Sequence, residues 1–244
     1  MRAFLVLTSA MFAWACAVHA ADPCGELTNG YGPYDYRTDK AKLTVVEVNH
    51  FTTKVENLQC CLNGPLEADL DYTLRAYPNH HRALLAMERL AANMHTERPP
   101  RAHYTVACYY ERAIRFRPDD GTTRMLYAAY LAKKGNAAEA IKHMEYIEKN
   151  AGPSANLDYN MGLVYADLKQ YDKALEHAHR AYQAGFNLPG LRAKLERAGK
   201  WRDPVPVGAK LGQGATTAAT AGNATVEGRD SAPPAAASST SANQ

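Results

Sequence analysis

The sequence lacks the short motifs that mark the common enzyme designs. It has no Gly-x-Ser-x-Gly, no His-Glu-x-x-His and no phosphate-binding glycine loop, which argues against a serine hydrolase, a zinc peptidase or a nucleotidase of the usual kinds. It has no Cys-x-x-Cys either, so a thioredoxin-like centre and a zinc ribbon have no support. We therefore expect a protein that is not an enzyme, with no catalytic residues, no metal site and no cofactor.

An excess of charge of one sign is also missing. The 244 residues include 28 Lys and Arg against 25 Asp and Glu, a net charge of +3, and no long basic run occurs. Nucleic-acid-binding modules carry a concentrated basic face, so this balance argues against a nucleic-acid partner. Hydrophobic residues make up 46% of the chain, which is enough for a folded core.

Long apolar runs are absent beyond the N-terminus. A positive Arg2 precedes the almost wholly apolar residues 3–14, and small residues occupy the cleavage-determining positions before Ala21. This pattern predicts a signal peptide at residues 1–20, cleavage near Ala20/Ala21, a periplasmic or secreted protein, and no integral membrane segment afterwards. A lipidated Cys16 is disfavoured, because a bulky residue lies two positions before it.

Four cysteines follow this leader: Cys24, Cys60, Cys61 and Cys108. An even number in a chain bound for an oxidising compartment predicts disulfides. Of the three possible pairings, the one that joins the neighbours Cys60 and Cys61 is geometrically poor. We expect Cys24 to pair with one of them and Cys108 with the other; the alternative is a single bridge with Cys108 reduced.

Composition divides the rest of the chain into three zones. Residues 21–64 form an irregular, aromatic segment, residues 65–201 a helical domain, and residues 203–244 a tail. The tail consists mainly of Ala, Thr, Ser, Gly and Pro and is predicted to be disordered, because it cannot bury enough apolar surface to offset the entropy of ordering. Leu43–Val48 fits a strand or the start of a helix, and we favour a short extended segment followed by helix.

The helical domain contains an internal repeat. When Ala140 is aligned with Ala174, an offset of 34, the flanking residues match in size or polarity, as Ile141 does with Leu175. Large, small and aromatic residues recurring with this period are typical of stacked helix pairs. We place copies at about 81–118, 121–152 and 155–186, with a terminal helix at 189–198 that covers the last apolar face.

The third copy resembles the tetratricopeptide-repeat (TPR) family in Tyr159-Asn160-Met161-Gly162, Tyr165, Tyr171-Asp172-Lys173-Ala174-Leu175 and Ala181. The resemblance implies an all-α fold, a solenoid of TPR-type helical hairpins. Gly162 and Ala174 let the two helices of a pair approach each other. The turns between paired helices are expected at Gly135-Asn136 and Lys169-Gln170.

The first copy departs from the period. Pro78 to Pro118 spans 40 residues, six more than the repeat, and we place the surplus in the loop His95–Arg101, where two prolines forbid helix. Pro65–Tyr77 is predicted to be a lone second helix before this copy. Two strings, Gly32–Arg37 and Asp71–Leu84, are similar to segments of exported repeat proteins of Gram-negative bacteria, which favours the periplasmic address.

Histidines and tyrosines offer further candidates for a site. His80 and His81 follow a proline turn, so a capping or packing role is favoured over metal binding. His143 and His177 occupy equivalent places in successive second helices, and with His179 they are interpreted as part of a solvated face. The segment Tyr31–Arg37 is interpreted as an aromatic plug for the first helices, with a recognition loop as the alternative.

In proteins that this chain resembles, the first helices of successive pairs line a groove that accepts an extended peptide or a partner helix. The repeat register predicts ten partner-binding residues, with Leu85, Thr122 and Leu126 beside them: Arg82, Arg89, Asn93, Met125, Lys133, Asn156, Tyr159, Asn160, Leu163 and Asp167. The sequence thus favours a periplasmic scaffold or adaptor that binds a protein or peptide. The alternative is an accessory subunit or enzyme with a site in the Cys- and Tyr-rich region between Cys24 and Cys61.

Overall fold

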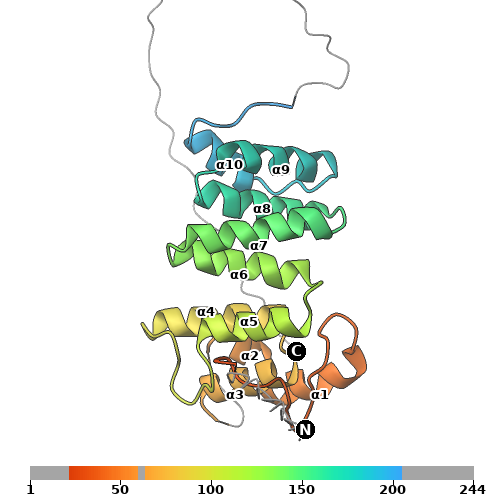
Figure 1. Ribbon diagram of the computed structural model, residues 1–244, viewed down its shortest axis with the longest axis vertical. Helices are drawn as coiled ribbons and strands as arrows, with labels where there is room; N and C mark the ends of the chain where they lie inside the picture. Colours follow the sequence, from red (N-terminus) through yellow and green to blue (C-terminus); the bar gives the residue numbers. More distant parts are fainter. Residues whose placement is uncertain (1–21, 60–63, 205–244) are drawn as a thin grey trace, which may run out of the picture. The chain divides into compact units, whose positions relative to one another are not determined.

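The computed structural model describes residues 22–59 and 64–204, and within these ranges the chain forms ten α-helices and no strand (Figure 1). The fold is therefore all-α, as predicted. The predicted leader at 1–20, Cys60, Cys61 and the tail from residue 205 onward lie outside the described residues.

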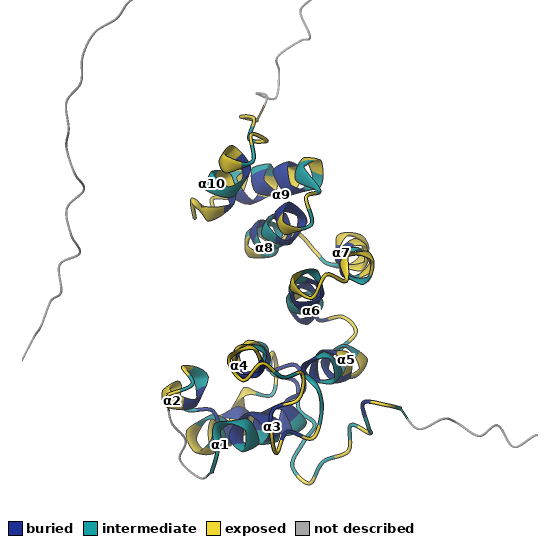
Figure 2. Ribbon diagram, turned by 90° about the vertical axis from the view of Figure 1, so that its left-hand side faces the viewer, coloured by how far each residue is buried: buried dark blue, intermediate teal, exposed yellow. Residues whose placement is uncertain are grey.

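Six of the helices form three consecutive hairpins, which coincide with the three predicted copies. Within each hairpin the first helix has 13 residues, and the first helices of neighbouring hairpins contact one another in series. Figure 2 shows buried residues where the helices face each other and exposed residues on their outer sides. The hairpins are α4 (His81–Asn93) with α5 (Val106–Phe116), α6 (Gly121–Lys133) with α7 (Ala137–Asn150), and α8 (Ala155–Asp167) with α9 (Tyr171–Gln183).

The turn that ends each first helix has the same backbone geometry in all three hairpins. A residue in the left-handed region follows the helix: His95 (φ 50°), Gly135 (φ 79°) and Lys169 (φ 59°). The next amide N–H then donates to a carbonyl five residues earlier, at 3.0, 2.9 and 2.8 Å respectively. These turns are 40 and 34 residues apart, so the predicted offset, the predicted turns and the surplus in the first copy are confirmed.

The proline turns that lead into α4 and α6 also share one backbone geometry. Tyr77 and Arg117 close the preceding helices with φ near −131° and −133°, and the N-cap residues His80 and Asp120 have φ of −74° and −79°. His80 Nδ1 accepts a hydrogen bond from the Ala83 amide at 3.2 Å, so the predicted capping role is confirmed.

Small residues allow the last helices to pack closely. The side chains of Ala174 and Ala178 are fully buried, and a Cβ atom at Gly162 would lie only 2.5 Å from the Leu191 side chain. Leu191 belongs to α10 (Gly190–Arg197), which contacts both α8 and α9. The predicted terminal helix is thus present where it was expected.

The N-terminal segment contains two helices, where the sequence predicted a short extended segment followed by helix. These are α1 (Lys40–His50) and α2 (Thr53–Glu56), and they precede α3 (Leu66–Ala76), the predicted lone second helix. The preferred extended conformation of Leu43–Val48 is wrong. Leu43 and Val46 are three residues apart and buried on one helical face, while Val45 and Val48 are exposed on the other.

Tyrosines fill the space between α1 and the end of α3. Tyr31, Tyr34, Tyr36 and Tyr72 surround a small core that contains the fully buried Tyr77. The rings of Tyr31 and Tyr34 meet edge to face with centroids 5.0 Å apart. This arrangement supports the interpretation of Tyr31–Arg37 as an aromatic plug.

Candidate functional site

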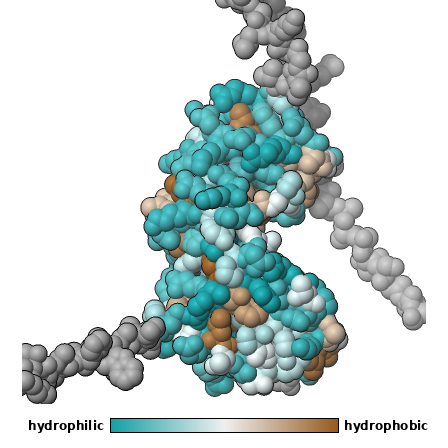
Figure 3. Space-filling model, turned by 45° about the vertical axis from the view of Figure 1, so that its right-hand side comes forward, coloured by the Kyte–Doolittle hydropathy of each residue, from teal (hydrophilic) through white to brown (hydrophobic). Residues whose placement is uncertain are grey.

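The candidate site is the outer face of the three first helices, which we call the first-helix surface. Helices α4, α6 and α8 contact one another in series, and Figure 2 places all three on the same side of the hairpins relative to α5 and α7. Figure 3 draws another side of the molecule, on which apolar side chains form small patches scattered among polar ones. The accessible residues that define the first-helix surface are Leu85, Asn93, Leu126, Lys133, Asn156, Asn160 and Leu163.

Two of the predicted binding residues on α4 instead hold α2 in place. Arg82 Nε donates to Glu56 Oε1 at 2.8 Å, and the guanidinium of Arg89 donates to the Glu56 carbonyl oxygen. The hydrogen bond from Arg82 holds the pKa of Glu56 below its usual value. Arg82 and Arg89 are thus engaged by α2 although both stay exposed, and their role in binding a partner stays a prediction.

Three other predicted binding residues are engaged by packing or by an ion pair. Met125 and Tyr159 are buried, with 7% and 6% of their surfaces exposed. The Tyr159 hydroxyl accepts a hydrogen bond from the Leu191 amide at 3.2 Å, and Asp167 forms an ion pair with Lys194. These partners lie on α10, so the predicted exposure of Tyr159 is wrong, whereas the side chain of Asp167 stays 58% exposed beside its ion pair.

The remaining predicted residues stay accessible. Asn93 and Asn156 are exposed, and the Asn160 amide donates to the Asn156 carbonyl oxygen at 2.8 Å. Lys133 bridges to Glu88 at 2.7 Å while two thirds of its side chain faces solvent. The structure therefore brings together a surface that mixes amides, one lysine and the partly exposed leucines.

A second cluster surrounds His177 on α9 and includes residues of α7 and α8. Its ring lies between two carboxylates, with Nδ1 2.8 Å from Asp158 Oδ1 and Nε2 3.2 Å from Glu148 Oε1. The Tyr165 hydroxyl donates to the same Glu148 oxygen at 2.7 Å. A cavity of about 330 Å³ opens beside this cluster. His177 is buried, so its predicted place on a solvated face is wrong.

The polar groups of the His177 cluster are engaged with one another. Burial opposes ionisation of Glu148, but hydrogen bonds from Tyr165 and His177 outweigh it and hold the pKa of this carboxyl below its usual value. Arg180 also donates to Asp158, at 2.9 Å. Each carboxylate is thus engaged by neighbouring side chains, and the cluster ties α7, α8 and α9 together.

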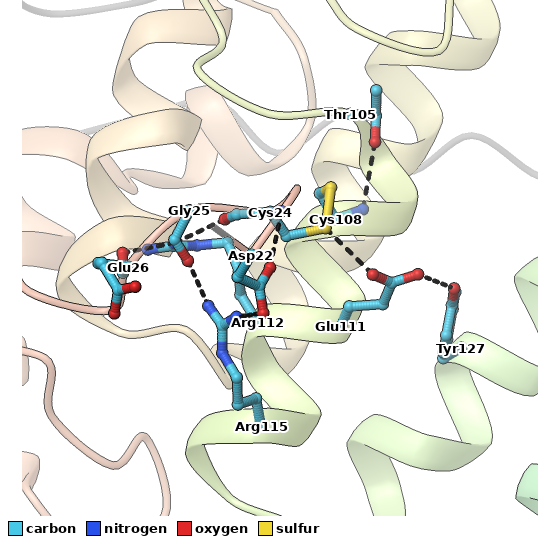
Figure 4. Close-up of a disulfide and its surroundings, with 10 residues drawn as sticks. All are labelled: Asp22, Cys24, Gly25, Glu26, Thr105, Cys108, Glu111, Arg112, Arg115 and Tyr127. Carbon is cyan, nitrogen blue, oxygen red and sulfur yellow. Dashed lines mark hydrogen bonds and ion pairs between the residues drawn. A yellow bond between two sulfur atoms is a disulfide. The ribbon is translucent and has the colours of Figure 1, made fainter. Parts of the chain in front are cut away.

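A disulfide joins the N-terminal segment to α5 (Figure 4). It links Cys24 with Cys108, so the expected pairings of these two residues with Cys60 and Cys61 are wrong, as is the alternative of a reduced Cys108. Cys24 Sγ lies 3.0 Å from one oxygen of Glu111, and the other oxygen accepts a hydrogen bond from Tyr127 at 3.0 Å. The disulfide therefore sits beside the contact between α5 and α6.

A buried arginine holds the same segment. Arg112 is 1% exposed, and its Nη1 donates to the carbonyl oxygens of Cys24, Gly25 and Glu26 at 2.9, 3.1 and 2.7 Å. Its guanidinium lies over the Tyr104 ring, 4.2 Å from the centroid. Burial lowers the pKa of Arg112. Charged hydrogen bonds to three successive carbonyls fix the path of residues 24–26.

Two buried carboxylates connect the N-terminal plug to the proline turns. The Asn79 amide donates to Asp35 at 2.8 Å and to Asp120 at 2.9 Å. Burial would raise the pKa of both carboxyls, but Arg37 holds the pKa of Asp35 well below its usual value, and His81 helps lower that of Asp120 to about 2. The segment around Tyr31–Arg37 is thus held by ion pairs and hydrogen bonds between side chains as well as by packing of aromatic rings.

Within the described ranges, one group of side chains has the spacing of a metal site: Cys24, Cys108 and Glu111. The two sulfur atoms of this group are bonded to each other. None of the described helices is long and apolar enough to cross a membrane. No protein-family model, curated protein or solved structure matches the chain.

Proposed function

We propose that this protein is a TPR-type interaction scaffold that holds a peptide or a partner protein in an exported, oxidising compartment. The observation that carries the proposal is a series of partly exposed leucines on the first-helix surface: Leu85 on α4, Leu126 on α6 and Leu163 on α8. Their helices contact one another in series, so the three leucines lie on neighbouring first helices. Apolar positions bordered by polar side chains are typical of surfaces that bind partners.

Two further features support the proposal. The hairpins repeat the same turn geometry, so successive first helices present equivalent positions to a ligand that runs across them. The Cys24–Cys108 disulfide supports the oxidising compartment, because such bonds persist outside the reducing cytosol.

The alternative site, in the N-terminal Cys- and Tyr-rich region, has less support from the geometry. Cys24 is buried and bonded to Cys108. The tyrosines of this region pack around Tyr77, and the Tyr31 hydroxyl donates to a backbone carbonyl of α1 at 3.0 Å. These side chains are engaged in holding the N-terminal segment against the helices.

The proposal is tested by quantitative affinity capture from cross-linked cell envelope. We compare the wild-type protein with the variant Leu85→Ser, Leu126→Ser, Asn160→Ala. The matched control is Val48→Ser, Leu188→Ser, which removes two exposed apolar side chains elsewhere, on α1 and before α10. We expect the surface variant to lose about tenfold or more of the captured partner, because a few central residues dominate most interfaces.

Circular dichroism and thermal unfolding must show that all three proteins are folded. Capture of the same partner in equal amounts by the wild type and the surface variant would contradict the proposal. An equal loss in the control would do so as well, because it would indicate non-specific apolar adhesion.

A further inference from the structure

The connection between α4 and α5 is longer than the repeat requires. It runs from Met94 to Thr105, whereas the turns between α6 and α7 and between α8 and α9 contain only Lys134–Asn136 and Leu168–Gln170. Three residues therefore suffice to close a hairpin of this protein. We call Met94–Thr105 the inserted loop; Figure 1 shows it extending from the end of α4 toward α3.

The inserted loop is held rigidly by buried and charged groups. The His103 amide and its ring Nδ1 both bond to Asp71, at 3.1 and 2.8 Å, and Asp71 is only 2% exposed on α3. At the other side of the loop, Glu97 accepts a hydrogen bond from the Tyr130 hydroxyl at 2.7 Å and forms an ion pair with Lys134. These contacts hold the loop against α3 and against the C-terminal end of α6.

The loop carries two arginines that have no ionic partner among the residues that the structure describes. Arg98 and Arg101 are exposed, and neither guanidinium has a carboxylate or carbonyl partner within the described ranges. Other arginines near the loop are engaged, as Arg75 is with Asp71 and Arg89 with Glu56. Arg101 also has φ 63°, in the left-handed region that side-chain-bearing residues rarely adopt.

Both arginines line one hollow of about 490 Å³. His103 and Thr96 line it too, and no carboxylate does. Met94 adds an apolar side chain that is 41% exposed. The hollow therefore combines two free cations, a histidine and an apolar edge, which complements a ligand that carries carboxylates next to apolar groups.

We propose that the inserted loop binds an acidic segment of a partner polypeptide, with its carboxylates on Arg98 and Arg101 and an apolar side chain against Met94. The proposal rests on the scaffold function and names the chemistry of one part of the partner. Met94 directly follows α4, which carries Leu85 and Asn93 of the first-helix surface. A partner that lies along α4 therefore reaches the loop.

The probe for the test is a synthetic peptide of alternating glutamate and leucine residues, with a glutamine-for-glutamate peptide as its neutral match and inorganic phosphate as the small-anion probe. Binding to the full-length chain is followed by calorimetry and by the NMR signals of arginine Nε–H groups. We expect the acidic peptide to shift the signals of Arg98 and Arg101 and to bind about tenfold or more tightly than the neutral peptide, because each charged hydrogen-bond pair adds to affinity.

The variant is Arg98→Gln, Arg101→Gln. Its matched control is Arg197→Gln, which removes an exposed arginine of α10 that has no ionic partner in the described part of the chain. We expect the loop variant to lose the preference for the acidic peptide and the control to keep it. Equal binding of both peptides, or an unchanged preference in the loop variant, would overturn the proposal. Phosphate that binds as tightly as the peptide and displaces it would also overturn it, in favour of a small-anion site.

The partner capture separates this inference from the scaffold proposal. If the loop variant captures the partner as well as the wild type while the Leu85, Leu126 and Asn160 variant does not, the scaffold function stands and the loop inference fails. If the loop variant alone loses capture and the acidic-peptide preference, the loop inference stands.

Discussion

At the scale of single residues, several buried charged side chains connect segments of the protein through hydrogen bonds. Arg112, Asp71 and Asp120 are each 1–2% exposed, and each binds segments that are distant in the sequence. Such groups are costly to desolvate, so they stabilise the fold only when their hydrogen bonds are made. Here they hold loops, which have little apolar surface of their own to bury.

The clearest case is Arg112, whose loss we expect to destabilise the protein. Arg112→Met removes the donor of three carbonyl hydrogen bonds from a buried position, so we expect the free energy of unfolding to fall by about 3 kcal/mol. Urea unfolding followed by circular dichroism measures the change. Arg197→Met, at an exposed position, is the control and should change stability by less than about 0.5 kcal/mol. A similar small change for Arg112→Met would show that the carbonyls find other donors.

At the scale of helices, periodicity located the hairpins but not the contacts that cover them. The 34-residue offset placed α6 to α9, and the proline turns placed α3 and the start of α4. Helix α1 was mistaken for an extended segment because Thr and Val have high β-propensity. Burial of Leu43 and Val46 against Tyr77 outweighs that local preference.

For the predicted binding residues too, sequence periodicity locates positions on the helices but does not tell which of them are exposed. Leu85, Met125 and Tyr159 occupy equivalent places in the three first helices, yet Leu85 is 38% exposed and the other two are buried. A repeat register gives equivalent positions on each helix. The packing around these positions differs from helix to helix: α10, for example, contacts α8, which carries Tyr159.

Helix α10 should stabilise the last hairpin through its two buried leucines. Leu195 is fully buried, so Leu195→Ala should lower the free energy of unfolding by about 2–4 kcal/mol through lost contacts and a cavity. Leu188, which precedes α10 and is 54% exposed, is the matched control, and Leu188→Ala should cost less than about 0.5 kcal/mol. Chemical denaturation gives both values, and hydrogen exchange should report faster opening of α9 only in the first variant. Equal costs for the two would mean that α10 is not packed as described.

At the scale of the molecule, buried carboxylates are concentrated where the N-terminal segment meets the hairpins. The stability of this part of the protein should therefore be sensitive to acid. The folded-state pKa of Asp120 is lowered to about 2 from 3.8, and those of Asp35 and Asp71 are lowered as well. A lowered pKa contributes stability that is complete above the unfolded pKa and is lost as the pH falls through the folded one. We therefore expect stability to fall between about pH 5 and pH 2, with Asp120 contributing about 2 kcal/mol.

Urea midpoints measured across this pH range for the wild type and for Asp120→Asn check the prediction. The variant keeps a capping side chain at the start of α6 but cannot titrate, so its profile should be flatter. Hydrogen exchange at low pH should show α3 to α5 losing protection before α8 and α9. Parallel pH profiles for the two proteins would exclude Asp120 as a source of the acid sensitivity.

The sequence alone was enough to determine the helical class, the three hairpins, their turns and the six-residue surplus, because these depend on local periodicity and on proline and glycine chemistry. The tertiary structure decided which residues are free. Four features depend on segments that are far apart in the chain. They are the pairing of Cys24 with Cys108, the hydrogen bonds from Arg82 and Arg89 to α2, the cover of Tyr159 by α10, and the lack of partners for Arg98 and Arg101 among the described residues. No local pattern encodes those distances, since they are set by how complete helices pack against one another.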